Sequence, residues 1–188
     1  MKSLILFLFL TVCFIGCSKK ESIIEGKVPN ASYDNEWVYL VPLKNPTKKT
    51  VDSTLIHNGS FRFNVKSKKQ NQVYIVRVRP ALRLKLQEIL VIPEQGIVHV
   101  DLDLRSSASG TPLNETLQQW KDKKQVSDSA CYSLRREYRK ETDEAKKNQL
   151  KTEIDSILKE NRTDMDSLAK KNKTNAIGQF LQSLKPEK

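Results

Sequence analysis

Between residues 23 and 104 the apolar residues of the chain fall into short runs, which turn-forming residues such as Gly, Pro and Asn separate. In one run, Phe61, Phe63 and Val65 alternate with polar residues, the period-two pattern of a strand with one face on a core and the other in water. The pattern predicts strands at 23–28, 37–41, 51–57, 60–65, 73–79, 89–92 and 97–104. About seven short antiparallel strands favour a β-sandwich or an open barrel.

Two short turns are expected to join neighbouring strands. The Asn-Gly pair at 58–59 can adopt the positive φ angles of a type I′ turn, so we expect a tight antiparallel hairpin between 51–57 and 60–65. Residues 94–96 are expected to join the last two predicted strands as a second antiparallel pair.

Beyond Gly110 the apolar spacing becomes helical. Thr111 at the cap, Pro112 in the first turn and an early acidic residue mark a helix start. Helices are expected from there to about residue 123, and at 131–147, 148–171 and 175–184. The third has one narrow apolar stripe, formed by Leu150, Ile154, Ile157, Leu158, Met165 and Leu168. Such a stripe fits a helical hairpin or coiled-coil arm with little core of its own.

The predicted fold is therefore α+β, with two regions in sequence order. A β-rich domain, an antiparallel sandwich or open barrel, occupies 23–110, and a helical region occupies 111–188.

The chain begins with a segment typical of an export signal. Lys2 supplies a positive start, and residues 4–15 are apolar except for Thr11. About twelve apolar residues are too few to span a bilayer core of roughly 30 Å as a helix, so a cleaved signal is expected rather than a membrane span.

The end of this segment resembles the lipobox of bacterial lipoproteins, in which a small residue precedes an invariant cysteine. Gly16-Cys17 fits that pattern, while Phe14 stands where leucine is usual. The resemblance implies a signal peptide at 1–16, acyl chains such as palmitate on Cys17, and a lipidated tether at 17–22. Two or more acyl chains anchor a protein stably. The alternative is an ordinary secretory signal in which Cys17 has no role.

The net charge of the chain excludes few classes of partner. Without the signal the chain carries 32 basic and 22 acidic side chains, a net charge of +10. This excess can serve nucleic acid, anionic lipid or solubility. An exported protein does not routinely meet nucleic acid, so no nucleic-acid partner is expected. A solvated surface and a basic face near membrane lipid remain the two interpretations.

The three cysteines offer no dithiol to the mature chain. Cys13 would leave with the signal and Cys17 would carry lipid, which leaves Cys131 alone. There is no C-x-x-C and no Cys/His spacing for zinc. Cys131 is either a buried apolar residue on a helix or a thiol that pairs or is oxidised in an oxidising compartment.

No catalytic set is assembled by the sequence, so we expect neither an enzyme nor a cofactor or metal site. His57 is expected beside a turn and His99 on an exposed strand face, without a nucleophile placed near either. Asp101 and Asp103 are expected on that same strand face, where two carboxylates could share a calcium ion, although a solvated face is the simpler interpretation.

One short pattern recurs along the chain: Asp-Ser followed by an apolar residue or threonine. It resembles a sequon for O-glycosylation of exported proteins in some Gram-negative bacteria. The alternative is that helical heptads place an acid and a serine beside a buried residue. The candidate glycosylation sites are Ser53, Ser129, Ser156 and Ser167.

Residues 22–120 resemble an uncharacterised β-rich domain of bacterial lipoproteins, often found ahead of a thioredoxin- or peroxiredoxin-like domain. The resemblance depends on the order and spacing of short pieces, each weak alone. They are Gly26-Lys27-Val28, Val38-Tyr39-Leu40, Asp52-Ser53-Thr54, Asn58-Gly59-Ser60-Phe61-Arg62-Phe63, Glu94-Gln95-Gly96-Ile97 and Ser109-Gly110-Thr111-Pro112-Leu113-Asn114. No redox residue carries over, because the paired cysteines of the longer proteins lie in a domain that this sequence does not contain.

The expected function is a lipid-anchored, non-enzymatic binding or scaffolding module of the cell envelope. Its expected place is the outer membrane, on the periplasmic side, with an unidentified envelope protein as partner. The alternative is an accessory of a periplasmic thiol–disulfide system that meets a thioredoxin-like partner through the helices and Cys131.

Overall fold

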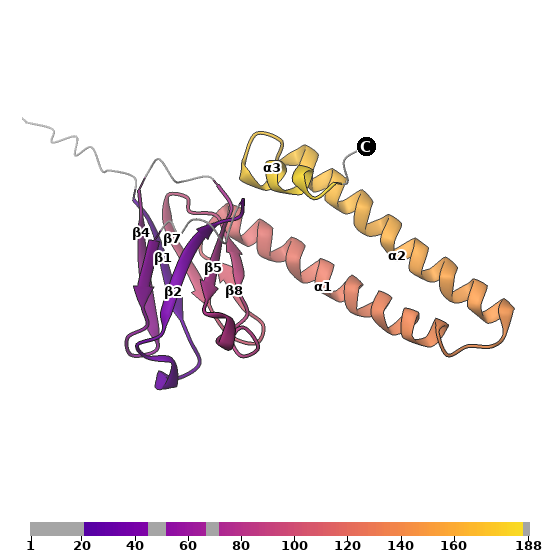
Figure 1. Ribbon diagram of the computed structural model, residues 1–188. Helices are drawn as coiled ribbons and strands as arrows, with labels where there is room; N and C mark the ends of the chain where they lie inside the picture. The colour runs from indigo at the N-terminus through magenta and orange to yellow at the C-terminus, as the bar shows by residue number, and fades with distance from the viewer. Residues whose placement is uncertain (1–20, 45–51, 67–71, 186–188) are drawn as a thin grey trace, which may run out of the picture.

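The computed structural model describes residues 21–44, 52–66 and 72–185, which form a two-sheet sandwich followed by three helices (Figure 1). One sheet has the order β4-β1-β7-β8, formed by Ser60–Val65, Ser22–Lys27, Gly96–Asp101 and Ser107–Ser109. The other has the order β3-β2-β5-β6, formed by Asp52–Leu55, Trp37–Pro42, Tyr74–Val78 and Ile89–Val91. The predicted α+β class and sandwich are confirmed, and the sheets do not close into a barrel.

The Asn-Gly turn is confirmed, but the hairpin predicted around it is wrong. Asn58 and Gly59 have φ angles of 51° and 68°. The His57 and Ser60 backbones exchange hydrogen bonds of 2.8 and 3.0 Å across the turn. The flanking strands nevertheless separate, because β3 pairs with β2 while β4 pairs with β1 in the other sheet. The turn, with the fully buried Ile56 before it, carries the chain from one sheet to the other.

The second predicted strand pair is also wrong. β6 pairs with β5, whereas β7 lies in the opposite sheet between β1 and β8. The β1–β7 pairing is parallel, the one exception to antiparallel pairing among the described strands. β7 ends at Asp101 rather than 104, and the short strand β8 was not predicted.

The main core lies between the two sheets and follows the predicted alternation. Phe61, Phe63 and Val65 are buried, and the residues between them are exposed. Close packing extends to the backbone of β1, where a Cβ on Gly26 would lie 1.9 Å from Phe61 Cζ. A side chain at position 26 would therefore displace the Phe61 ring from the core.

The helices are longer than predicted. α1 (Pro112–Tyr138) runs without the expected break between 123 and 131, and α2 (Glu144–Lys171) starts beyond a turn at 139–143, inside the predicted helix 131–147. The intervening residues are mostly polar but contain no Gly or Pro, so nothing interrupts the helix. The last helix, α3 (Ala176–Ser183), is confirmed within one or two residues.

A second, smaller core holds the helices against the sandwich. α3 folds back over the base of α2, and its buried residues pack with Ile92 after β6. Trp120 of α1 meets Phe180 of α3 edge to face, with ring centroids 5.5 Å apart. Within the described ranges, no helix has the length and apolar character needed to cross a membrane.

Candidate functional site

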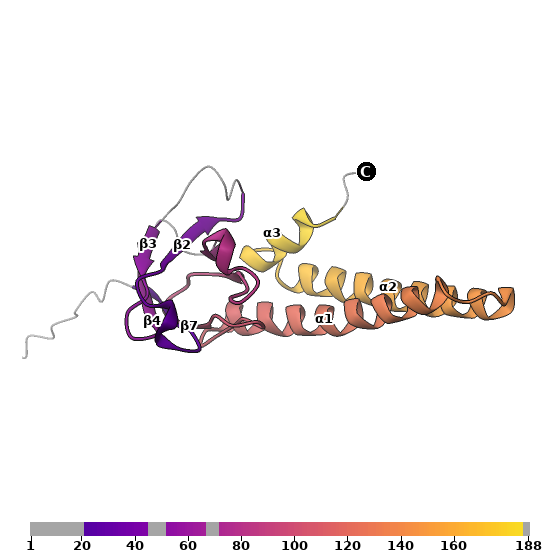
Figure 2. The same ribbon diagram turned by 60° about the horizontal axis from the view of Figure 1, so that its bottom comes forward.

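α1 and α2 form an arm that extends from the sandwich, as both views show (Figure 2). The helices have 27 and 28 residues, so each is roughly 40 Å long. Between residues 122 and 160 only Cys131 and Ile154 are buried. The outer part of the arm is therefore a thin helical hairpin that exposes most of its surface.

Asn114 joins the arm to the sandwich. Its side chain is fully buried, and its amide donates to the Ile92 carbonyl at 2.7 Å while its carbonyl accepts from the Ile92 N–H at 2.9 Å. The amide also donates to Thr111 Oγ1 at 2.8 Å. The side chain thus satisfies both backbone groups of Ile92, as a neighbouring strand would.

The first turn of α1 is fixed by two acidic side chains. Glu115 accepts a hydrogen bond from the backbone N–H of Gly110 at 2.9 Å, and Glu94 accepts one from the N–H of Leu113 at 2.8 Å. Carboxylates placed here accept hydrogen bonds from free N–H groups and are stabilised by the positive end of the helix dipole. The start of the arm is therefore held in one orientation on the sandwich.

Further along α1, two polar side chains form hydrogen bonds to the backbone of strand β8 and of the residue before it. Gln118 accepts from the backbone N–H of Ala108 at 3.0 Å, and the Lys121 amine donates to the Ser106 carbonyl. Burial lowers the pKa of the Lys121 amine, with the nearby Asp122 acting in the opposite direction. Asn114, Gln118 and Lys121 share one face of α1, which is the face that grips the sandwich.

Two open hollows lie where this face of α1 leaves the sandwich. One, of about 540 Å³, is lined by Arg105, Gln118 and Val126 among others. The other, of about 670 Å³, lies between the start of β6 and α1, with Leu90 on one side and Tyr132 on the other. Both hollows are also lined by Lys121, Gln125 and Ser129. The surface is therefore concave on both sides of this face of α1, at the point where the arm leaves the sandwich.

The opposite side of α1 faces α2 and carries the contacts that close the arm. Lys123 forms an ion pair with Asp164, which raises the pKa of the Lys123 amine. Lys185, after α3, pairs with Asp166 at 2.6 Å and lowers the pKa of that carboxyl. These ion pairs lie in the inner half of the arm and fasten α2 to its neighbours.

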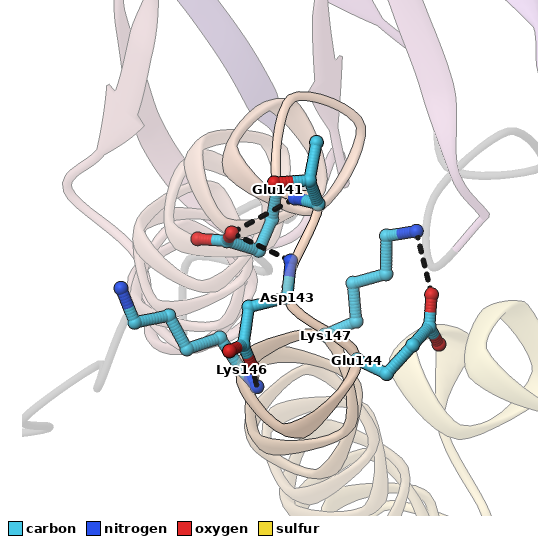
Figure 3. Close-up of polar contacts among 6 residues, drawn as sticks. Glu141, Asp143, Glu144, Lys146 and Lys147 are labelled. Atoms are coloured by element: carbon cyan, nitrogen blue, oxygen red, sulfur yellow. Dashed lines mark hydrogen bonds and ion pairs between the residues drawn. The ribbon is translucent and has the colours of Figure 1, made fainter.

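The turn at the end of the arm is ordered by its own acidic side chains (Figure 3). The Glu141 carboxylate accepts from the backbone N–H groups of Thr142 and Asp143 at 2.8 and 3.0 Å, and hydrogen bonds from Asp143 and Thr142 lower its pKa. Asp143 caps α2 by accepting from the Lys146 N–H at 2.9 Å. Glu144 pairs with Lys147 at 3.1 Å.

The candidate residues for metal or acid–base chemistry do not form a site. His57 and His99 are both exposed as expected, on separate elements. Asp101 ends β7, but Asp103 lies in the following turn and accepts the Leu104 N–H at 2.7 Å, so the expectation that the two share a strand face is wrong. In the described part of the chain no three His, Cys, Asp or Glu side chains lie together as metal ligands would.

Cys131 is a free thiol on α1 with 4 % of its surface exposed. It lies on the side of α1 that faces α2, so a reagent reaches the thiol only if α2 moves. Cys13, Cys17 and the signal peptide lie outside the described residues, as does most of the tether.

All four candidate glycosylation serines are exposed. Ser53 lies in β3, Ser129 on α1, and Ser156 and Ser167 on α2. On a helical wheel Ser156 and Ser167 share the side of α2 opposite the buried Ile154. Each hydroxyl is thus placed where a transferase could reach it.

Comparison with known proteins identifies the β-rich part. A family model described as a domain of unknown function, DUF4369, matches residues 22–117. The chain belongs to this family. The match covers the sandwich and the first turns of α1, including Asn114, while the outer arm lies beyond it. No curated protein and no solved structure matches the chain.

Sequence reasoning missed the residues that attach the arm. Asn114, Gln118 and Lys121 look like ordinary polar positions of a helix surface. Their partners are backbone groups of Ile92 after β6, Ala108 in β8 and Ser106 before β8. The spacing of four and three residues between them was the available signal, since it places all three on one helix face.

Proposed function

We propose that this protein is a lipid-anchored, non-enzymatic scaffolding module of the cell envelope whose arm binds a partner protein. The observation that supports the proposal is the arm itself: two helices of roughly 40 Å that leave the sandwich and bury only two side chains between residues 122 and 160. A hairpin with so little internal core gains little stability from its length. Its exposed surface is therefore best explained as a surface for binding.

The anchor in this proposal is Cys17, and its support comes from the signal-like sequence before it. The proposed place is the periplasmic side of the outer membrane. Labelling with an alkynyl palmitate analogue tests the anchor: the wild-type protein is expected to be labelled and to fractionate with membranes, and Cys17→Ala to lose both properties. A Cys17→Ala protein that keeps its label and its membrane fraction would overturn the anchor.

The role of the arm is tested by shortening it while keeping its ends. Removing residues 125–138 and 144–157 takes about four turns from each helix, so the faces of the remaining turns stay nearly in register. Chemical crosslinking in native membranes should then lose the protein's crosslinked complex. Fractionation should stay unchanged, and the far-ultraviolet circular dichroism should lose only the helical signal of the removed residues. A shortened protein that keeps the complex would place the binding surface on the sandwich.

We further propose that one or more of the exposed Asp-Ser serines are glycosylated in the native host. The intact mass of natively purified protein should exceed that of the lipidated polypeptide, and replacing Ser53, Ser129, Ser156 and Ser167 together with Ala should remove the excess. A native mass equal to the lipidated polypeptide would contradict this.

A further inference from the structure

The face of α1 that grips the sandwich continues past it without a partner in the described structure. At 3.6 residues per turn, the line through Asn114, Gln118 and Lys121 is extended by Gln125, Ser129, Tyr132, Arg136 and Arg139. The first three residues of this line bind the sandwich, and the last three are exposed. We call residues 125–138 on this side of α1, together with Arg139 and Lys140 at the start of the following turn, the outer face.

The outer face has a concave, partly apolar inner end. Tyr132 lines the larger of the two hollows and is 64 % exposed, and Val126 lines the other and is 71 % exposed. Large side chains left in water beside a hollow are typical of a surface that a second molecule covers.

The outer end of the same face is cationic. Arg135, Arg136, Arg139 and Lys140 are all exposed, and none forms an ion pair with another described residue. The acidic residues of the adjoining turn are already engaged, since Glu141 and Asp143 accept backbone hydrogen bonds and Glu144 binds Lys147 (Figure 3). The four cations are therefore available to an external anion.

The residue types of these four cations favour a protein, rather than a lipid, as the molecule that supplies the anion. Only nine of the 33 basic residues in the chain are arginines, yet arginine supplies three of these four cations. Arginine pairs bidentately with carboxylates, and Arg and Tyr are enriched where protein interfaces concentrate their binding energy. Lipid head groups attract lysine as well as arginine, so attraction to a bilayer does not explain the preference.

The direction of the arm also favours a partner other than the anchoring bilayer. Glu21, where the described chain begins, bonds Gly96 at one end of β7, whereas Lys121 bonds Ser106 beyond the other end. α1 thus runs away from the chain's entry, and Arg139 lies roughly 27 Å beyond Lys121. The four residues from Cys17 to Glu21 reach at most about 14 Å.

We propose that the outer face of α1, with the two hollows at its inner end, docks an acidic surface of the partner protein. The partner's carboxylates bind Arg135, Arg136, Arg139 and Lys140, and apolar side chains beside them cover Tyr132 and Val126. This deepens the proposed function, on which it rests, by giving the site on the arm and the chemistry of the partner.

The test uses the full chain in neutral detergent micelles and poly-L-glutamate as the acidic polypeptide. Arg135→Gln, Arg136→Gln and Arg139→Gln together should weaken binding at low salt by about tenfold or more and reduce its salt dependence. The matched control removes three exposed α2 cations by Lys159→Gln, Lys170→Gln and Lys171→Gln, with the same change in net charge. The control should change binding by less than about twofold.

Two results would overturn the proposal. Equal losses in the two triple variants would show that net charge alone attracts the polymer. Micelles doped with phosphatidylglycerol that displace poly-L-glutamate from the wild-type chain, but not from the arginine variant, would assign the outer face to lipid. Either result leaves the shortened-arm experiment unaffected, so a failure of this site and a failure of the arm as a binding element are distinguishable.

Discussion

The sandwich and the arm use the same side-chain types in opposite ways. Four of the five sandwich arginines, Arg62, Arg77, Arg79 and Arg83, bind carboxylates at 2.5–2.9 Å, while Arg105 has no such partner among the described residues. In the arm, none of Arg135, Arg136, Arg139 and Arg162 has such a partner among the described residues. The sandwich buries a continuous core between its sheets, whereas the outer arm buries two side chains. The difference indicates that the sandwich is organised for its own stability and the arm for contact with another molecule.

The largest loss of stability is expected from a change in the core of the sandwich. Phe63→Ala removes a ring that is 1 % exposed and should cost about 3–5 kcal/mol of unfolding free energy, measured by urea denaturation. Ile154→Ala, its counterpart in the arm, should leave the sandwich's urea midpoint almost unchanged and increase hydrogen exchange only along α1 and α2. A common loss of stability in both variants would show that arm and sandwich unfold as one unit.

The next effect concerns the joint between the two regions. Asn114→Ala leaves the buried N–H and C=O of Ile92 without their side-chain partner, which should cost about 1–3 kcal/mol. Paired spin labels at Arg62 and Ser133 should report a broader distance distribution in this variant than in the wild type. Thr116→Ala, which removes one exposed hydroxyl from the same turn, should leave the distribution unchanged.

The sequence predicts the elements better than it predicts their partners. Alternation places Phe61, Phe63 and Val65 in the core because a strand's period depends on the strand alone. The Asn-Gly turn is likewise local, but the sheet that each flanking strand joins depends on distant partners such as Trp37, which pairs with Leu55. β8 has a single buried residue, Ala108, and therefore no alternation to detect.

The candidate site was less predictable still. An arm with a narrow core followed directly from the stripe around Ile154. The attachment through Asn114 did not, because its hydrogen bonds are to backbone groups that any sequence possesses. A polar helix residue that binds a distant backbone cannot be distinguished, by sequence alone, from one that faces water.

A smaller effect tests the thiol–disulfide alternative. Cys131→Ser places a hydroxyl where a buried sulfur lay and should cost about 1 kcal/mol without altering the crosslinked complex in cells. An accessory of a thiol system would instead lose its mixed disulfide with a partner. A partner trapped by the wild-type protein and released by reductant, but absent in Cys131→Ser, would favour that alternative.

The smallest effect concerns the turn at the end of the arm. Because backbone hydrogen bonds lower the pKa of folded Glu141, its stabilisation of the turn is present above the pKa of the unfolded chain and is lost as pH falls through the folded pKa. The amide resonances of Thr142 and Asp143 should therefore titrate together in acid, below the usual pKa range of glutamate. In Glu141→Gln this titration should be absent; its persistence would assign it to another carboxyl.

Photocrosslinking in native cells shows whether the arm presents the binding surface and the sandwich supports it. Tyr132 on the arm and Trp37 on the sandwich are matched probes, since they are aromatic and 64 % and 46 % exposed. A benzophenone amino acid should capture one protein partner in high yield at position 132 and not at position 37. Capture at position 37 alone, or equally at both positions, would show that the arm is not the principal binding surface.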